Sequence, residues 1–346
     1  KARNRAIEVA QGDYLYCCDA DDFCKPNLLE GAVQVAECYD ADVVLLPFML
    51  YDNKIATSIS VPWSLPRHLF PEGCFTWHDN PDATFSTFRT VPWNKLVRTS
   101  FIRDNAIHFQ DDVFLSEDVM FSLPAAVLAQ RVACTDEPAL YHRENIGTSA
   151  MDTKDAHPLD FVRAFQALRA FLEEQGCMCE LRHSYLVWVA GGCVYNLLTL
   201  KNRESFDEVF SYLNSCGLHD LDISEADLSE IDNVDDVNVL RAIFANDRDR
   251  LLHAEQLRLR MAFDQACYRE RMQFEARQAL ENRLREQETA TREAQAAVEE
   301  LQASLEALRD EHERAMNAAE QKIGRAVCRI PRAVQRKLLS TKQREQ

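Results

Sequence analysis

A stretch of about seventy residues, positions 250–320, contains neither proline nor glycine. Because these residues punctuate most turns, the stretch predicts one long helix. Residues along it recur at alternating steps of four and three, the spacing of a coiled-coil seam. The series is Leu280, Leu284, Gln287, Thr291, Ala294, Val298, Leu301, Leu305, Leu308, His312, Ala315 and Ala319. The chain therefore divides into a globular part and a helical extension.

Polar residues at Gln287, Thr291 and His312 interrupt the seam, so we expect only modest coiled-coil stability. Two interpretations stay open. The helix pairs with a second copy of the chain, which we favour, or it is a solvated single helix supported by charge pairs four residues apart.

The first fifty residues alternate between helical and strand patterns. Ala2–Ala10 resembles the second half of a helix, and Asp13–Cys18 is a short apolar run that predicts a buried strand. A helix is expected after Pro26, and Val43–Leu50 is a second continuous apolar run, again strand-like. This alternation predicts an α/β sheet.

Downstream, residues 51–92 predict loops and short strands around a cleft. Trp93–Asn105 and Glu117–Ala129 predict helices, and Arg131–Thr135 and Pro138–His142 predict strands. From Asp155 the pattern is helical. Further helices are expected over 180–200, 204–214 and 234–250, and one helical face is formed by Phe161, Phe165, Leu168 and Leu172.

Charge is unevenly distributed. The formal net charge is -17, yet residues 322–346 contain eight Lys or Arg and one acid, against 31 bases and 55 acids elsewhere. An acidic body argues against a nucleic-acid partner. The basic end alternates its charges with Ile323, Val327, Ile330, Val334 and Leu338, and Pro331 interrupts it. It predicts either a peripheral contact with anionic lipid or an unstructured basic tail.

The 12 cysteines form no C-x-x-C pair, which argues against a structural zinc site. We interpret the thiols as reduced and mostly buried. No signal peptide or membrane-spanning run is visible, so the sequence predicts a cytoplasmic protein, with the inner membrane face as a place for the basic tail.

Three carboxylates lie close together directly after the first predicted strand, at Asp19, Asp21 and Asp22. Ligands of open α/β sheets bind at the carboxyl ends of strands. Carboxylates this close repel one another unless a cation lies among them, so a divalent metal that holds phosphates is one interpretation. The other is a strand-to-helix turn with a capping Asp.

Three further groups have both a functional and a structural interpretation. Glu117 and Asp118 open a predicted helix, where they either stabilise its dipole or supply a general base. Trp93 and Asn94 either pack under a loop or form the wall of a sugar pocket. His142 is either structural or part of a metal or pyrophosphate site.

The order of these motifs resembles glycosyltransferase family 2. The resemblance covers about residues 1–151. It rests on Ala2-Arg3-Asn4-Arg5-Ala6, Ala10-x-Gly12-Asp13-Tyr14-Leu15, Asp19-Ala20-Asp21-Asp22, Pro26 with Leu29-Glu30, Trp93-Asn94-Lys95-Leu96, Glu117-Asp118-x-x-Phe121, Leu140-Tyr141-His142-Arg143, and Ser149 with Met151. One departure is Arg5-Ala6, where the family typically has a glycine.

The resemblance implies a GT-A fold and transfer of a sugar from a nucleotide diphosphate sugar to a glycan or lipid-linked acceptor, with inversion, in cell-surface polysaccharide synthesis. It implies Asp118 as the catalytic base. The donor would be bound by Asp19, Asp21, Asp22, Arg3 and Asn4, and the acceptor side formed by Trp93, Asn94 and Glu117. The Mg²⁺ or Mn²⁺ ligands would be Asp21, Asp19 and His142.

Family members begin with strands that hold the nucleoside base, and nothing before Lys1 supplies them here, so the resemblance implies a GT-A sheet that lacks its first strands. We expect the truncated GT-A domain over 1–151, a helical region over 152–250, a coiled coil over 251–321 and a basic amphipathic tail over 322–346.

Two other functions compete with the transferase. One is a catalytically dead, truncated GT-A domain that serves as a coiled-coil scaffold. The other is a nucleotidyltransferase, which also pairs carboxylates with a metal. It usually needs a glycine-rich phosphate loop near its start, and none is visible.

Overall fold

The structure, a computed structural model, describes residues 1–61, 64–144, 150–328 and 334. Ser149 and most of the expected basic tail, positions 329–333 and 335–346, lie outside this description. The chain forms two compact units, residues 1–259 and 260–346.

The strands of the first unit are β1 (Tyr14–Tyr16), β2 (Phe23–Cys24), β3 (Val43–Leu45), β4 (Phe48–Asp52), β5 (Thr57–Ser60), β6 (Lys95–Arg98), β7 (Val132–Cys134) and β8 (Leu140–Glu144). Its α-helices are α1 (Ala2–Val9), α2 (Leu28–Tyr39), α3 (Thr84–Phe88), α4 (Thr99–Asp104), α5 (Val119–Leu128), α6 (Asp160–Glu174), α7 (Arg182–Leu198), α8 (Arg203–Tyr212), α9 (Leu218–Asp220) and α10 (Val234–Phe244). Short 3₁₀ turns are η2 (Arg67–Leu69), η3 (Trp77–Asp79), η4 (Pro81–Ala83), η5 (Pro92–Asn94), η6 (Ala150–Ala156) and η8 (Ala226–Glu230), and η7 (Leu213–Gly217) is a π-helical turn.

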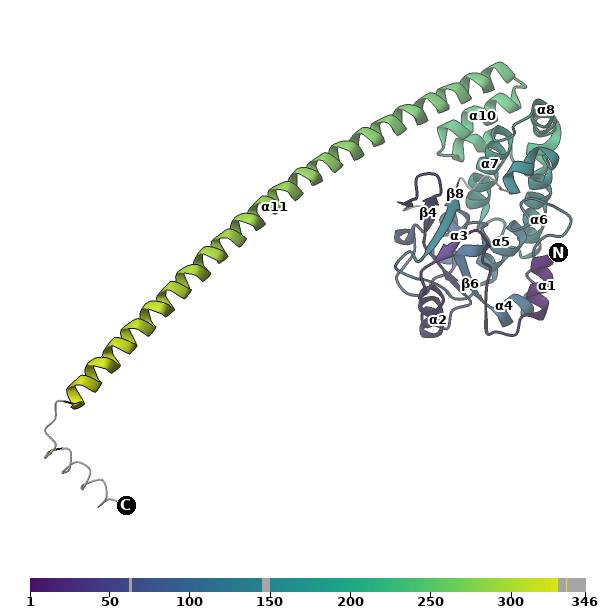
Figure 1. Cartoon of the computed structure of the whole chain (residues 1–346). Helices are drawn as coiled ribbons and strands as arrows, with labels where there is room; N and C mark the ends of the chain where they lie inside the picture. The colour runs from purple at the N-terminus through teal and green to yellow at the C-terminus, as the bar shows by residue number, and fades with distance from the viewer. Residues whose placement is uncertain (62–63, 145–149, 329–333, 335–346) are drawn as a thin grey trace. The chain divides into compact units, whose positions relative to one another are not determined.

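Two four-stranded sheets organise the first unit (Figure 1). The first has the order β1-β6-β3-β7, with β6 antiparallel to both neighbours and β3 parallel to β7. The second has the order β2-β8-β4-β5, with β4 parallel to β8. The mixed α/β architecture confirms the predicted fold class.

Strand β3 is buried on both faces. Val43 and Leu45 pack in the larger hydrophobic cluster of the unit, and Val44 packs in a second cluster with Ala32 and Ala36 of α2. Because alternate strand residues point to opposite faces, a continuous apolar run is the pattern of a strand covered on both sides. The expected strand and helix layers follow from this alternation.

The apolar run Val43–Leu50 forms two strands rather than the single strand predicted. Leu46 leaves the first sheet, where its backbone N–H donates to the carbonyl of Asn94 (2.9 Å), and Pro47 has no N–H to donate. The chain then enters the second sheet as β4. A continuous hydrophobic run does not by itself show that its two halves belong to different sheets.

The helix predicted over Trp93–Asn105 is also wrong in its first half. Pro92 opens the turn η5, and the next four residues form the central strand β6 between β1 and β3. Only Thr99–Asp104 is helical. Pairing with two strands at once outweighs the local helical pattern, because strand preference depends strongly on tertiary context.

The helical region packs on the sheet domain around one core. The four residues expected on one face, Phe161, Phe165, Leu168 and Leu172, are all buried in α6, in the same cluster as Val43 and Phe121. The boundary expected between 151 and 152 therefore lies inside a single compact unit.

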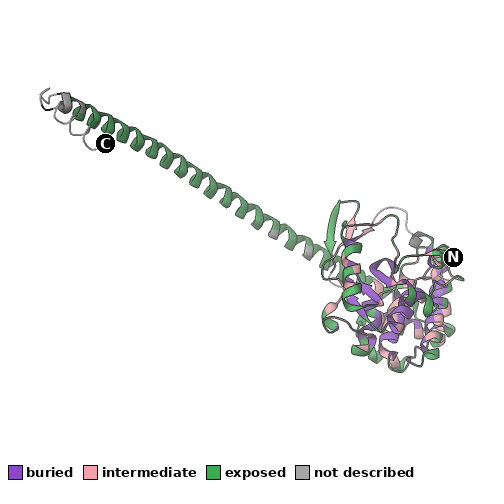
Figure 2. Ribbon diagram, turned by 90° about the horizontal axis from the view of Figure 1, so that it is seen from below, coloured by how far each residue is buried: buried purple, intermediate pink, exposed green. Residues whose placement is uncertain are grey.

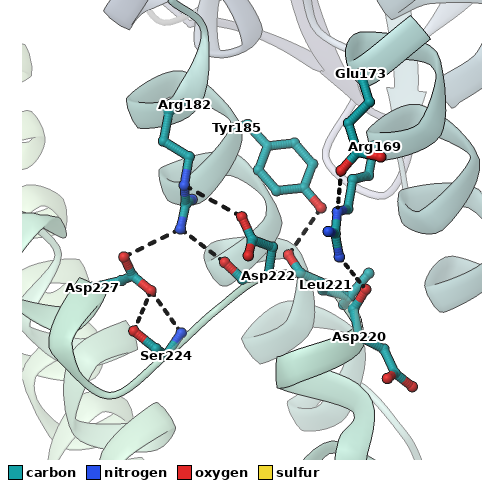
Figure 3. Close-up of polar contacts among 9 residues, drawn as sticks. All are labelled: Arg169, Glu173, Arg182, Tyr185, Asp220, Leu221, Asp222, Ser224 and Asp227. Carbon is teal, nitrogen blue, oxygen red and sulfur yellow. Dashed lines mark hydrogen bonds and ion pairs between the residues drawn. The ribbon is translucent and has the colours of Figure 1, made fainter. Parts of the chain in front are cut away.

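Three consecutive carbonyls, beginning at the last residue of α9, are held by side chains of α6 and α7 (Figure 3). Arg169 donates to the carbonyl of Asp220 (3.1 Å), the Tyr185 hydroxyl to that of Leu221 (3.0 Å), and Arg182 to that of Asp222 (2.8 Å). These bonds supply partners that the irregular backbone cannot provide for itself.

The long helix α11 (Arg248–Cys328) begins in the first unit and forms most of the described part of the second. Its apolar side chains, such as Leu301 (69% exposed) and Leu308 (67% exposed), are open to solvent, as Figure 2 shows along the helix. The continuous helix confirms the prediction from its proline- and glycine-free sequence. None of the described helices is long and apolar enough to cross a membrane.

Tyr185 allows a test of the packing of the helical region. Its side chain is fully buried, so Tyr185→Phe leaves the Leu221 carbonyl without this donor, and we expect the free energy of unfolding to fall by about 1–2 kcal/mol. The measurement is chemical denaturation. Tyr195→Phe, on the same helix but 54% exposed, is the matched control and should change it by less than about 0.5 kcal/mol. Equal effects of the two variants would contradict the arrangement.

Candidate active site

A cleft of about 1140 Å³ lies between the sheets and the helical region. The sheet domain contributes Trp93, Asp118 and His142, and the helical region contributes residues of α7 and α10. Cavities of this size that combine aromatic and polar side chains are typical of ligand sites. Of the residues predicted for the base and the acceptor side, Asp118 and Trp93 are therefore brought together in one cavity.

Asp118 is the N-cap residue of α5, in a dense protein environment at the edge of the cleft. Burial, and to a lesser degree the neighbouring Glu117, raises the pKa of Asp118 to about 7, although Lys95 and Arg3 act in the opposite direction. A carboxylate with a pKa near the operating pH is well matched to accepting a proton. The geometry thus fits the role predicted for Asp118.

The loop before Asp118 is fixed from both ends. The Asp160 carboxylate, at the start of α6, accepts from the backbone N–H groups of Phe114 (2.6 Å) and Leu115 (3.0 Å). Gln110 donates to the carbonyl of Glu117 (3.1 Å), and Ser116 adopts a left-handed backbone conformation with φ 65°. A non-glycine residue in this region is strained, so the surrounding bonds must hold the turn in place.

Lys95 is a buried cation that the sequence reasoning did not single out. Its ammonium donates to the carbonyls of Arg89 (2.9 Å) and Val91 (2.7 Å) and to Oδ1 of Asn94 (2.6 Å). Burial lowers the pKa of Lys95 to about 7, and the charge of Asp118 partly opposes that shift. The signal in the sequence was its place in the motif Trp93-Asn94-Lys95-Leu96, which assigned Lys95 no role of its own.

Asn94 was expected on the acceptor side, but its side chain is buried and bonded to Lys95 rather than lining the cleft. Trp93, by contrast, lines the cleft. Its ring stacks on His142 with centroids 4.6 Å apart and meets the edge of Phe48 at 4.7 Å. The turn at Pro92 thus directs Trp93 toward the cavity and Asn94 beneath it.

Arg3 connects the two acidic motifs. Its guanidinium pairs with Glu117 (2.6 Å) and with Asp19 (3.2 Å). Glu117 therefore does not line the cleft, as an acceptor-side residue would, but contacts Arg3 behind it. The bridge fixes the strand-end carboxylates relative to the loop that carries Asp118.

Asn4, predicted at the donor, has a structural arrangement. Its Nδ2 donates to the Phe109 carbonyl (2.8 Å) and to Asp111 (3.1 Å), and its Oδ1 accepts from the Phe109 N–H (2.8 Å). These bonds tie α1 to the start of the loop before Asp118.

Asp22 has a fully buried carboxylate that holds β8. It accepts from the backbone N–H of Arg143 (2.9 Å) and contacts Nδ1 of His142 (3.0 Å). Burial lowers the pKa of His142, but the hydrogen bond and charge of Asp22, with Asp19, outweigh it and raise that pKa. Asp22 thus orients His142 at the cleft.

The strand-end carboxylates have the chemistry of a divalent-cation site. Asp19 is half-buried, and its pKa is raised by burial and by Asp22 and Asp21 against the effect of Arg3. A cation would relieve this accumulation of negative charge, and carboxylate oxygens are the ligands that Mg²⁺ prefers. Within the described residues, no three His, Cys, Asp or Glu side chains form a ready metal cluster. Asp19 and Asp21 therefore fit such an ion only together with oxygens from a ligand.

The helical region supplies a wall that the sequence analysis did not predict. His183, Trp188, Tyr195 and Asn196 of α7 and Asp236 of α10 all line the cleft. In the sequence these residues look like ordinary members of amphipathic helices. Only the packing of α6 and α7 against α3 and α5 turns them toward Asp118.

Comparison with known proteins shows which family the first part of the chain is similar to. Residues 1–101 match the sequence profile of Glycosyl transferase family 2. The fold is similar to that of residues 1–349 of Staphylococcus aureus TarS in complex with UDP-GlcNAc, with a TM-score of 0.54, 20% identity, and coverage of 74% of this chain and 70% of that one. Residues 1–101 are therefore similar to glycosyltransferase family 2, and the similarity to this solved structure is one of fold.

Two curated relatives are similar in sequence. Poly(ribitol-phosphate) beta-N-acetylglucosaminyltransferase TarS of Staphylococcus aureus is 25% identical over 182 residues, which is 50% of this chain but only 29% of TarS. Cholesterol galactosyltransferase of Borreliella burgdorferi is 24% identical over 195 residues, 53% of this chain and 52% of that protein. The matched part thus covers less than a third of TarS and about half of the galactosyltransferase.

Proposed function

We propose that this chain transfers a sugar from a nucleotide diphosphate sugar to a hydroxyl of a glycan or lipid-linked acceptor, with inversion. The observation that carries the proposal is Asp118, a carboxylate with a pKa near 7 at the edge of a large cleft. Through Glu117 and Arg3 it is connected to the strand-end carboxylate Asp19. The family 2 match and the fold of a neighbour crystallised with UDP-GlcNAc support a nucleotide sugar as donor.

In this mechanism Asp118 accepts the proton of the acceptor hydroxyl as its oxygen attacks the anomeric carbon from the face opposite the diphosphate. One displacement of this kind inverts the configuration. Lys95 beneath the site supplies positive charge that favours the ionised base, as its effect on the pKa of Asp118 indicates. The loop fixed by Asp160 keeps the base in position.

On the donor side, Asp19 and Asp21 would hold Mg²⁺ or Mn²⁺, which when bound neutralises charge on the departing diphosphate. His142 lies beside this site. Because Asp22 contacts its Nδ1, its Nε2 is left to bind either the metal or the pyrophosphate. Trp93 forms the wall against which the transferred sugar or its acceptor packs.

A polymeric cell-surface glycan as acceptor is part of this proposal. The resemblance to family 2 suggested it, and the poly(ribitol-phosphate) in the name of the relative TarS supports a polymer. The scaffold alternative is disfavoured because Asp19, Asp21 and Asp118 are present and Asp118 lines a cleft.

Donor binding is tested by thermal shift with UDP, GDP and UDP-GlcNAc, with and without Mn²⁺. We expect a metal-dependent rise of several degrees in Tm with at least one nucleotide, since a ligand that binds only the native state stabilises it. Asp21→Ala should abolish the shift, and Asp136→Ala, which removes an acid after β7, should keep it. No shift with any nucleotide would contradict a donor site in this chain.

Catalysis by Asp118 is tested by measuring sugar transfer or donor hydrolysis across pH 5–9. The base is active when ionised, so kcat/KM should fall as pH decreases through about 7. Asp118→Asn should lower kcat by at least about 100-fold while keeping the nucleotide-induced thermal shift. Asp112→Asn, an exposed residue of the same loop, is the control. Full activity of Asp118→Asn would rule out its role as the base.

We also propose that α11 self-associates. Its seam residues Leu280, Leu301, Leu305 and Leu308 are each more than 60% exposed. Apolar residues at this spacing bury their surface when a second helix packs against them. The basic tail as a membrane contact stays a prediction.

Sedimentation equilibrium at micromolar concentration tests the association. The chain should sediment as an oligomer, and the double variant Leu301→Asn with Leu308→Asn should sediment as a monomer, because polar residues at seam positions remove buried apolar area. Ala303→Asn with Asp310→Asn has the same spacing off the seam and should stay assembled. A monomeric unmodified chain would exclude the proposal.

A further inference from the structure

The cleft is larger than the reaction at Asp118 requires. Its volume of about 1140 Å³ exceeds the upper end of the range typical for small-molecule sites, roughly 300–1,000 Å³. Its lining continues from Asp118 and Trp93 to Trp188 and Tyr195 on α7 and Asp236 on α10. The part beyond the base therefore has room for more than the single hydroxyl group that reacts.

Aromatic faces form one side of this extension. Trp188 is held edge-on by Phe165 (4.7 Å) and Phe85 (6.3 Å between centroids). Tyr195 lies seven residues further along the same helix and is 54% exposed. The Lys154 ammonium lies 4.5 Å from the centroid of its ring. Fixed aromatic rings offer flat apolar surfaces at little cost in conformational entropy, which suits the C–H faces of sugar rings.

The floor between these two rings consists of Gly191 and Gly192. A Cβ at Gly192 would lie 2.6 Å from the Phe165 ring, and one at Gly191 would lie 3.3 Å from a carboxylate oxygen of Asp236. Glycine thus lets α7 expose backbone to the cleft while Phe165 and Asp236 approach it closely. Asp236, at the first turn of α10, places hydrogen-bond acceptors beside the aromatic faces.

The excess of negative charge in the cleft favours neutral hydroxyl-bearing ligands over anionic ones. Its described lining contains five carboxylates and only two Lys or Arg side chains. One of these two, Lys154, is buried and already bonded to the Thr199 hydroxyl. A phosphodiester chain would meet like charge along this wall, and burial of unpaired negative charges is costly.

We infer that the extension of the cleft along α7 and the start of α10 is the acceptor site, and that it binds an uncharged, hydroxyl-rich glycan. The inference rests on the proposed transferase function and specifies its acceptor. Trp188 and Tyr195 stack on sugar rings, and Asp236 accepts from their hydroxyl groups. A polyol phosphate polymer, of the kind in the name of the relative TarS, does not suit this wall.

The test is equilibrium binding of the full chain to an array of neutral oligosaccharides, uronic-acid oligosaccharides and ribitol phosphate oligomers, without nucleotide. We expect binding to neutral glycans only. Tyr195→Ala and Asp236→Asn should each weaken it by about 10-fold, whereas Tyr39→Ala, at an exposed tyrosine of α2, should not change it. Tyr195 is exposed, so its variant should fold even if Trp188→Ala, which removes core contacts, does not.

Tighter binding of the ribitol phosphate oligomer, no binding to any neutral glycan, or neutral binding unchanged in Tyr195→Ala would overturn the inference. Its failure is separable from failure of the proposed function. The nucleotide-induced thermal shift depends on Asp21 and reports the donor side alone. A chain that binds neutral glycans but no nucleotide would be a glycan-binding protein rather than a transferase.

Discussion

Burial of strand β3 on both faces is the constraint from which the rest of the first unit follows. Val43 and Leu45 require an apolar layer on one side, and Val44 requires another on the opposite side. Helix α2 supplies one layer, and the other is the larger cluster, which also contains residues of α5, α6 and α7. With both faces covered, polar groups collect at the strand ends and the adjoining loops, which is where the acidic motifs lie.

The site then depends on charges kept in an environment of low polarity. Lys95 and Asp118 shift one another's pKa toward the charged forms, while burial shifts both toward the neutral forms. Neither group would have a pKa near 7 in water. Arg3 connects Asp19 to Glu117, and the buried carboxylate of Asp22 holds His142 at the cleft.

Much of the sheet and its acidic motifs could be predicted from sequence, because apolar runs and clustered carboxylates are local signals. The predictions failed where a partner strand decided the outcome, at Pro47 and at Lys95–Arg98. For the site, the sequence indicated Trp93, Asp118 and His142 but placed Asn94 in the cavity, because a motif does not show which way each side chain of a turn points. The residues that α7 contributes to the cleft could not be predicted from the sequence, because residues that line a cavity have the same helical spacing as residues that line a core.

Residues 152–250 share their core with the sheet domain, and this has a consequence for how such proteins can be recombined. Asp160 holds the loop before the base, and Phe165 of the same helix supports both that core and the glycine floor of the cleft. Grafting the helical segment onto another GT-A sheet would therefore disturb catalysis together with acceptor preference. In this architecture catalysis and acceptor preference can only be changed together, whereas the helix after residue 259 could be exchanged independently.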